Sequence, residues 1–158
     1  MRAALALARR GLGAVWPNPA VGCVLVREDW RGRVVGRGWT QPGGRPHAES
    51  EALRRAGHEM ARNATAYVSL EPCDHFGETP PCSQALAAAG VRRAVIAVED
   101  PDPRVRGRGI ARLAAAGVAV STGLLGDEAS RLNAGFFIKM RRGRPLITLK
   151  VATTLDGR

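Results

Sequence analysis

The chain has 158 residues, of which 45% are hydrophobic, and this length and composition predict one globular domain with a sizeable core. No apolar run approaches the roughly 18–20 residues that cross a bilayer, and the N-terminal segment lacks a secretory cleavage pattern, so we expect a cytoplasmic protein without a membrane partner. The net charge of +10 comes from arginines spread along the chain with few aromatic residues, so we expect no nucleic-acid partner.

Helical and strand-like segments alternate along the sequence, which predicts a layered α/β fold. An amphipathic helix is expected at residues 1–10. The later helices are expected at 48–57, 82–89, 109–116 and 127–140. The strands are expected at 21–26, 34–39, 66–70, within 91–98 and at 118–121. Glycines and prolines mark the connections between these elements, including the loop at 74–81.

Two short segments carry the side chains with the clearest chemical meaning. His47-Ala48-Glu49 opens one predicted helix, and Glu71-Pro72-Cys73 runs on to Pro80-Pro81-Cys82 at the start of another. A catalytic zinc takes three nitrogen, sulfur or oxygen ligands from the protein and keeps its fourth position for water. His47, Cys73 and Cys82 fit that ligand count, so we predict one Zn²⁺ per chain.

Glu49 follows the histidine by two residues and is predicted to lie beside the open position of the metal without binding it. A metal lowers the pKa of its bound water, and a nearby carboxylate can take the water proton and pass it to the substrate. This pattern is typical of zinc-dependent nucleobase deaminases. One difference is that eight residues, in place of two, separate Cys73 from Cys82.

Each of these residues alone would more often be an ordinary core or surface residue, and only their combination favours a metal site. Cys23 illustrates this: it lies in an apolar strand-like run and is predicted to be a buried core thiol. With three cysteines, two of them in metal-ligand contexts, a disulfide framework is not expected.

The run from Ser69 to Cys82, with its Gly77-Glu78-Thr79-Pro80-Pro81-Cys82 ending, resembles the deaminase domain of the bifunctional riboflavin-biosynthesis deaminase/reductase family. The resemblance covers essentially the whole chain. It implies a three-layer α/β/α cytidine-deaminase-like fold with a central mixed sheet. It also implies a zinc hydrolase that deaminates 2,5-diamino-6-ribosylamino-4(3H)-pyrimidinone 5′-phosphate to 5-amino-6-(5-phosphoribosylamino)uracil and releases ammonia.

The resemblance also implies roles for residues outside the metal motif. Asn18 is expected to contact the pyrimidine, and Asp100 and Asp102 the ribose-phosphate side of the substrate. His75 belongs to the family motif without an assigned role. The family resemblance further implies a homo-oligomer.

Residues 1–142 are expected to be the deaminase domain and residues 143–158 the start of a truncated reductase domain. NADPH would then be needed only by the missing part of that reductase.

Three positions depart from the family pattern. Glu78 stands where a lysine or arginine is usual near the substrate phosphate, so Arg104, Arg106 or another arginine would have to compensate. Thr40 replaces a common histidine, and Asp102 a common asparagine. Two alternatives therefore stay open: a related nucleobase or tRNA deaminase, and a non-catalytic domain that zinc stabilises.

Overall fold

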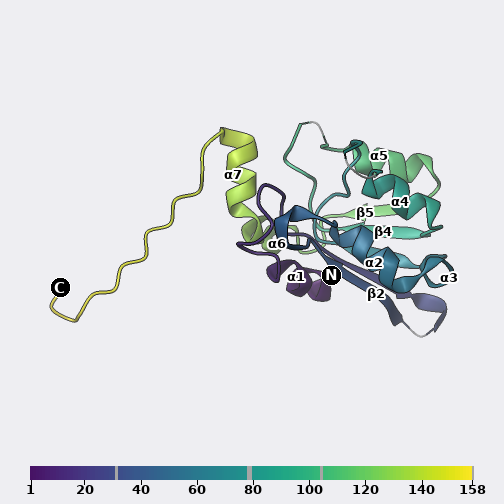
Figure 1. Cartoon of the computed structure of the whole chain (residues 1–158), viewed down its shortest axis with the longest axis horizontal. Helices are drawn as coiled ribbons and strands as arrows, with labels where there is room; N and C mark the ends of the chain where they lie inside the picture. The colour runs from purple at the N-terminus through teal and green to yellow at the C-terminus, as the bar shows by residue number, and fades with distance from the viewer. Residues whose placement is uncertain (31, 78–79, 104, 158) are drawn as a thin grey trace.

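The structure is a computed structural model that describes residues 1–30, 32–77, 80–103 and 105–157. Within them, one five-stranded sheet has the order β2-β1-β3-β4-β5 (Figure 1). β1 pairs antiparallel with β2 and β3, whereas β3, β4 and β5 are parallel, so the sheet is mixed as predicted. The strands are β1 (Gly22–Arg27), β2 (Arg33–Trp39), β3 (Thr65–Val68), β4 (Arg93–Ile96) and β5 (Ala119–Thr122).

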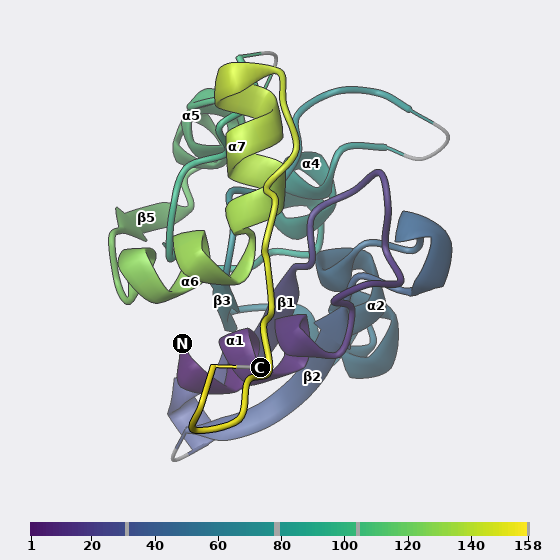
Figure 2. The same ribbon diagram turned by 90° about the vertical axis from the view of Figure 1, so that its left-hand side faces the viewer.

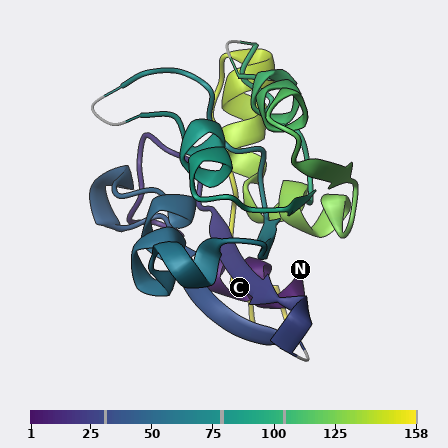
Figure 3. The same cartoon turned by 90° about the vertical axis from the view of Figure 1, so that its right-hand side faces the viewer.

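Helices cover both faces of the sheet. Figure 2 shows α1 (Arg2–Arg9), α6 (Gly126–Leu132) and α7 (Ala134–Arg142) on the side that faces the viewer. Figure 3 shows the opposite side, with α2 (Ala48–Ala56), α3 (His58–Ala61), α4 (Cys82–Ala88) and α5 (Arg108–Ala115). Two short 3₁₀ helices, Glu28–Trp30 and Pro42–Gly44, lie in the loops. The predicted α/β/α layering is confirmed.

The apolar residues of the central strands are buried on both faces of the sheet, as strands covered by helices on both sides require. The larger core lies on the side of α2, α4 and α5, where Ala66, Val68 and Ile96 have no exposed surface. A smaller cluster of Leu5, Ala97 and Ala129 joins the sheet to α1 and α6. Cys23 is buried in the larger core, which confirms the prediction of a core thiol.

Two glycines let helices pack closely on the sheet. A Cβ atom at Gly22 would lie 1.9 Å from the carbonyl oxygen of Ala4 in α1. A Cβ atom at Gly38 would lie 2.0 Å from the carbonyl oxygen of Ala48 in α2. Both distances are far below van der Waals contact, so only glycine fits. Gly38 therefore fixes the start of α2, which carries His47 and Glu49.

The prediction of one helix at 127–140 is wrong, because the chain breaks at Asn133 into α6 and α7. The Asn133 side chain accepts a hydrogen bond from the backbone N–H of Ala20 and donates one to its carbonyl oxygen, at 2.9 and 2.8 Å. This pair of bonds ties the junction of the two helices to the loop before β1. The short helix α3 was also absent from the prediction.

The C-terminal segment at 144–157 runs away from the body of the molecule as an extended chain (Figure 1). Its apolar side chains are exposed, with Ile147 at 82% and Leu149 at 84% of their full surface. Among the described helices, none combines the length and the apolar character that a bilayer span requires.

We expect Gly38→Ala to destabilise the fold by about 2 kcal/mol or more, since overpacking forces backbone shifts. The matched control is Gly135→Ala in α7, where the new Cβ would meet its nearest atom at 3.9 Å. Urea denaturation of both variants measures the effect. Equal unfolding midpoints for the two would contradict the close packing of α2 on β2.

Candidate active site

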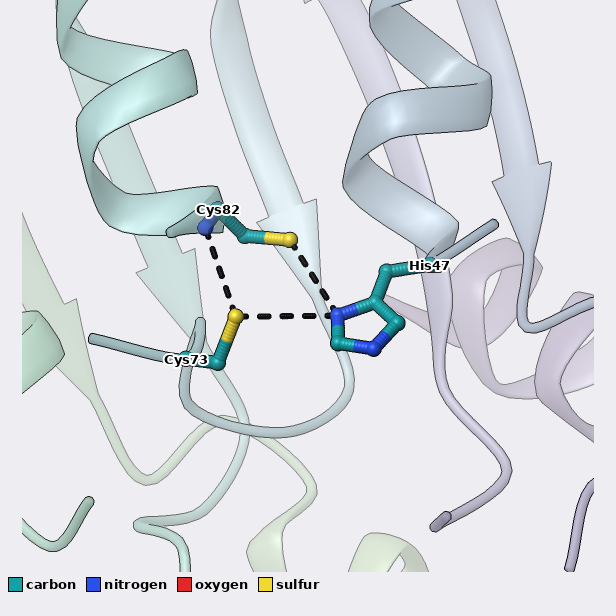
Figure 4. Close-up of side chains that lie close together, drawn as sticks. All are labelled: His47, Cys73 and Cys82. Carbon is teal, nitrogen blue, oxygen red and sulfur yellow. Dashed lines mark hydrogen bonds between the residues drawn. The ribbon is translucent and has the colours of Figure 1, made fainter. Parts of the chain in front are cut away.

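His47, Cys73 and Cys82 come from different parts of the sequence and meet at one point (Figure 4). His47 immediately precedes α2, Cys73 follows the end of β3, and Cys82 is the first residue of α4. Their ligand atoms all lie within 4.8 Å of one another. The histidine turns its Nδ1 atom toward both sulfur atoms, at 3.6 Å from Cys73 Sγ and 3.4 Å from Cys82 Sγ.

These distances fit a tetrahedral zinc site. Zn–N and Zn–S bonds of about 2.0 and 2.3 Å at a tetrahedral angle place nitrogen and sulfur about 3.5 Å apart. The two observed nitrogen–sulfur distances bracket that value. One imidazole and two thiols are also the donor set that zinc prefers. The arrangement therefore suits a zinc ion with three protein ligands and one open position.

The surroundings of the cysteines favour ionisation of one thiol before the other. Hydrogen bonding from Cys82 lowers the pKa of the Cys73 thiol to about 4, even though burial acts in the opposite direction. The backbone N–H of Cys82 donates to Cys73 Sγ at 3.3 Å. Hydrogen bonding to Cys73, together with burial, raises the pKa of Cys82. The first turn of α4 thus stabilises the Cys73 thiolate.

Glu49 lies in the first turn of α2 with only 3% of its surface exposed. Burial raises the pKa of its carboxyl group to about 7, and the Cys82 thiol is a hydrogen-bonding neighbour. The carboxyl group is therefore next to the candidate metal ligands. It is not one of the three groups that form the metal cluster.

A cavity of about 270 Å³ opens onto this cluster. It brings together the predicted residues that the sequence scatters over more than 80 positions. Six of the seven line it: Asn18, His47, Glu49, Cys73, Asp100 and Asp102. The seventh, Cys82, is joined to the cavity wall through its contacts with His47 and Cys73. The side chain of His75 also faces the cavity.

Asn18 is held by a neighbour that must be glycine. Its Nδ2 atom donates to the carbonyl oxygen of Gly44 at 2.8 Å. A Cβ atom at Gly44 would lie 2.4 Å from that nitrogen, and the positive φ of +88° also favours glycine. One amide N–H is thereby committed to the backbone, which orients the rest of the amide group at the cavity wall.

Glu71 is a buried residue that holds a neighbouring segment of backbone in place. The sequence analysis identified it only as part of a motif. Its carboxylate accepts four backbone hydrogen bonds, from Asp100 and Gly107 on one oxygen and from Gly109 and Ile110 on the other. It is 3% exposed. Because these donors lie on the segment from β4 into α5, Glu71 fixes the loop that carries Asp100 and Asp102.

Thr40 is also structural. Its hydroxyl accepts a hydrogen bond from the backbone N–H of Val21 and donates one to the carbonyl oxygen of Pro19. It therefore holds the chain beside Asn18. Of the other departures from the family pattern, Asp102 is 7% exposed and its backbone N–H donates to Asp100 Oδ1. Glu78 and Arg104 lie outside the described residues.

Residues 1–98 match the family described as the cytidine and deoxycytidylate deaminase zinc-binding region. That match covers well over half of the 158 residues. The chain belongs to this deaminase family. Family membership explains why the imidazole, the two thiols and the carboxylate converge, and it supports zinc as the metal.

Comparison with individual proteins shows which members of the family this chain resembles. The riboflavin biosynthesis protein RibD of Escherichia coli is 55% identical over all 158 residues, which are 42% of its own length. Acinetobacter baumannii RibD, form 1, superposes with a TM-score of 0.91 at 49% identity, over 99% of this chain and 43% of that one.

A Thermotoga maritima protein gives a TM-score of 0.92 at 40% identity, over 99% of this chain and 44% of its own length. That protein is named as a diaminohydroxyphosphoribosylaminopyrimidine deaminase/5-amino-6-(5-phosphoribosylamino)uracil reductase. The predicted resemblance of this deaminase chain is thus confirmed. The chain spans less than half the length of these relatives.

We expect Glu71→Gln to destabilise the protein by about 2–5 kcal/mol. The new amide group would present N–H donors to two backbone N–H groups, and each buried donor without an acceptor costs about 1–3 kcal/mol. Glu99→Gln is the matched control, because that carboxylate is 50% exposed and makes a single 3.5 Å ion pair. Urea denaturation compares them, and a Glu71 variant as stable as the control would contradict the organising role.

A second prediction concerns Asp100. Burial raises the pKa of its carboxyl group from 3.8 to about 6, so the folded state binds the proton more tightly than the unfolded state. The resulting stabilisation is complete below about pH 4 and is lost as the pH rises through 6. Asparagine stays neutral and keeps an acceptor for the Asp102 N–H.

Relative to wild type at equal zinc loading, Asp100→Asn should therefore gain on the order of 2 kcal/mol in free energy of unfolding between pH 4 and pH 8. Denaturant titrations across this range measure the gain. A difference that does not change with pH would refute the assignment.

Proposed function

We propose that this deaminase chain hydrolyses 2,5-diamino-6-ribosylamino-4(3H)-pyrimidinone 5′-phosphate to 5-amino-6-(5-phosphoribosylamino)uracil and ammonia, a step of riboflavin biosynthesis. The observation that carries the proposal is one cavity lined by two of the three candidate zinc ligands, by Glu49 and by three further predicted polar residues. The name of the Thermotoga maritima relative, 40% identical over nearly the whole chain, supports this substrate.

His47, Cys73 and Cys82 would hold the zinc ion through Nδ1 and the two Sγ atoms. When bound there, zinc supplies a Lewis acid that lowers the pKa of water at the open position. The chain contributes the orientation of the donors: the backbone N–H of Cys82 supports the Cys73 sulfur, and α2 fixes the imidazole.

Glu49 is the proton carrier of the proposed reaction. The water oxygen forms a bond to the ring carbon that bears the 2-amino group. Glu49 takes one water proton and delivers it to the adjacent ring nitrogen. It then moves the second proton to the amino group, the carbon–nitrogen bond breaks with its electron pair on nitrogen, and ammonia leaves. The carbon keeps the water oxygen as a carbonyl group, so atoms and charge balance.

The other polar residues of the cavity would select and orient the substrate. Asn18 can present both a donor and an acceptor to the edge of the pyrimidine, because its amide carries both groups. Asp100 and Asp102 offer acceptors for ribose hydroxyl groups. Glu71 keeps both aspartates in place through its bonds to the backbone of their loop.

The test is ammonia release from the pyrimidine phosphate, compared with cytidine and tRNA substrates, by wild type and by Glu49→Gln. We expect the variant to retain its zinc and to lose about 10²–10⁴-fold in rate, the usual weight of general acid–base catalysis. Glu51→Gln is the control on the same helix, since its carboxylate pairs with Arg54 and Arg55.

A preference for tRNA or cytidine would favour the related-deaminase alternative. Unchanged turnover in Glu49→Gln would remove the proposed mechanism. A zinc-loaded chain that releases no ammonia from any of these substrates would favour the non-catalytic alternative.

We also propose that residues 1–142 form the deaminase domain and that residues 143–158 begin a reductase domain. The exposed apolar side chains of Ile147 and Leu149 support this, because an isolated segment of this kind needs a sheet or core to cover it. Brief trypsin digestion should cut the segment first and leave 1–142 folded. Protection of the segment against trypsin would contradict this boundary.

Three further expectations depend on the same family relationship. We propose that the protein is located in the cytoplasm and that it forms a homo-oligomer. We also propose that NADPH binds only to the reductase domain of a longer protein. Light scattering after size-exclusion chromatography would measure the oligomeric state, and a monomer would refute that part. Fluorescence titration with NADPH should show no binding to this chain.

A further inference from the structure

The cavity that opens onto the candidate metal ligands has an uneven distribution of charge. Its described lining includes four carboxylate side chains, those of Glu49, Glu71, Asp100 and Asp102. The permanently charged cations among the described lining residues are Arg45 and Lys139. A substrate with a phosphate group must place that group away from the carboxylates. The two cations therefore mark where an anion can be bound.

Arg45 reaches across the wall of the cavity. It is half-buried and lies two residues before His47, between the 3₁₀ helix at Pro42–Gly44 and α2. Its Nη2 atom lies so close to Gly77 that a Cβ atom there would be 2.9 Å away. The guanidinium group thus lies between the start of α2 and the segment that follows Cys73. With five N–H donors, it can bind a phosphate oxygen in addition to a protein partner.

Lys139 comes from a different element, the last turns of α7, and is half-buried. Its Nζ atom lies 3.8 Å from the centre of the Trp16 ring. A cation over an aromatic face is held by the electrons of the ring. Lys139 itself lines the cavity, whereas Trp16 lines the neighbouring one, so this contact holds the ammonium group between the two. The N–H groups that do not face the ring can be donated to an anion. Asn133 joins α7 to the loop before β1, so both partners of the contact are anchored.

We propose that Arg45 and Lys139 form the subsite for the phosphate monoester of the substrate. This inference rests on the proposed function, because the reacting carbon must lie at His47 and Glu49 and the phosphate must extend away from them. Proteins use both the planar guanidinium fork of arginine and the compact ammonium charge of lysine to bind phosphate groups. Arg45 also supplies a positive charge beside the segment in which the family pattern is broken by Glu78.

Arg106 does not fill this role. Its guanidinium group pairs with Glu99 and faces a separate cavity at the ends of β4 and β5. Compensation for Glu78 by Arg106 stays a prediction, because Glu78 lies outside the described residues. The sequence analysis also allowed another arginine to compensate for Glu78, and Arg45 is an arginine that lines the cavity.

The test uses the zinc-loaded chain and ribose 5-phosphate as the probe, with ribose as its uncharged counterpart. Isothermal titration calorimetry should show that Arg45→Ala and Lys139→Ala each weaken ribose 5-phosphate binding about tenfold or more, the usual weight of a charge-assisted hydrogen bond. Arg45→Lys and Lys139→Arg should recover most of the affinity. The control is Arg2→Ala, an exposed arginine outside the lining of the cavity, and it should bind as wild type does.

The same variants are then compared on the pyrimidine phosphate and on its dephosphorylated form. The ratio of kcat/KM for the two substrates should fall about tenfold or more, through KM rather than kcat. Wild-type affinity in both alanine variants would overturn the subsite, as would a loss of bound zinc in parallel with affinity. Binding of ribose 5-phosphate that depends on Arg45 and Lys139, without ammonia release, would support the subsite and refute the proposed reaction.

Discussion

The placement of one imidazole nitrogen within 3.4–3.6 Å of two sulfur atoms is the constraint on which this structure depends. These side chains come from three segments that have no local reason to meet. Each segment is held by something other than the ligand itself. α2 packs closely on β2 at Gly38, and Cys73 lies in the segment after β3, two residues after the anchored Glu71. Cys82 is fixed as the first residue of α4.

Side chains that satisfy backbone groups hold the loops around this centre. Glu71 binds four backbone N–H groups of the segment that leads from β4 into α5, and Asn133 binds both backbone polar groups of Ala20. Asn18 binds the carbonyl oxygen of Gly44. Buried backbone polar groups need partners, and loops lack the regular ones of helices and strands. Polar side chains therefore anchor the loops around the cavity, in addition to the apolar packing on both faces of the sheet.

Much of this could be predicted from the sequence because the signals are local. The ligand set follows from residue type and spacing, and the five strands follow from apolar runs between glycines and prolines. The break at Asn133 could not be predicted, because a bond to Ala20, more than 100 residues away, interrupts an otherwise helical pattern. Glu71 was missed for the same reason. Its four partners lie 29–39 residues further along the chain, in the segment that leads from β4 into α5, and only the folded chain brings them near.

The role of individual basic residues can be interpreted only from their positions in the fold. Arg45 and Lys139 are two among 24 basic residues and have no distinguishing sequence context. Their position in the same cavity as four carboxylates sets them apart. The net charge of +10 alone did not indicate a nucleic-acid partner, and it was also compatible with a small substrate that carries a phosphate group. The geometry points to a small anionic ligand, recognised by two cations from separate elements.

The most direct test of the account is metal analysis of the purified chain combined with X-ray absorption spectroscopy at the zinc edge. The account predicts one zinc ion per chain with two sulfur ligands at about 2.3 Å and lighter ligands at about 2.0–2.1 Å. Cys73→Ser should remove one sulfur from that spectrum. A chain without stoichiometric zinc, or a zinc ion bound only by nitrogen and oxygen, would contradict it.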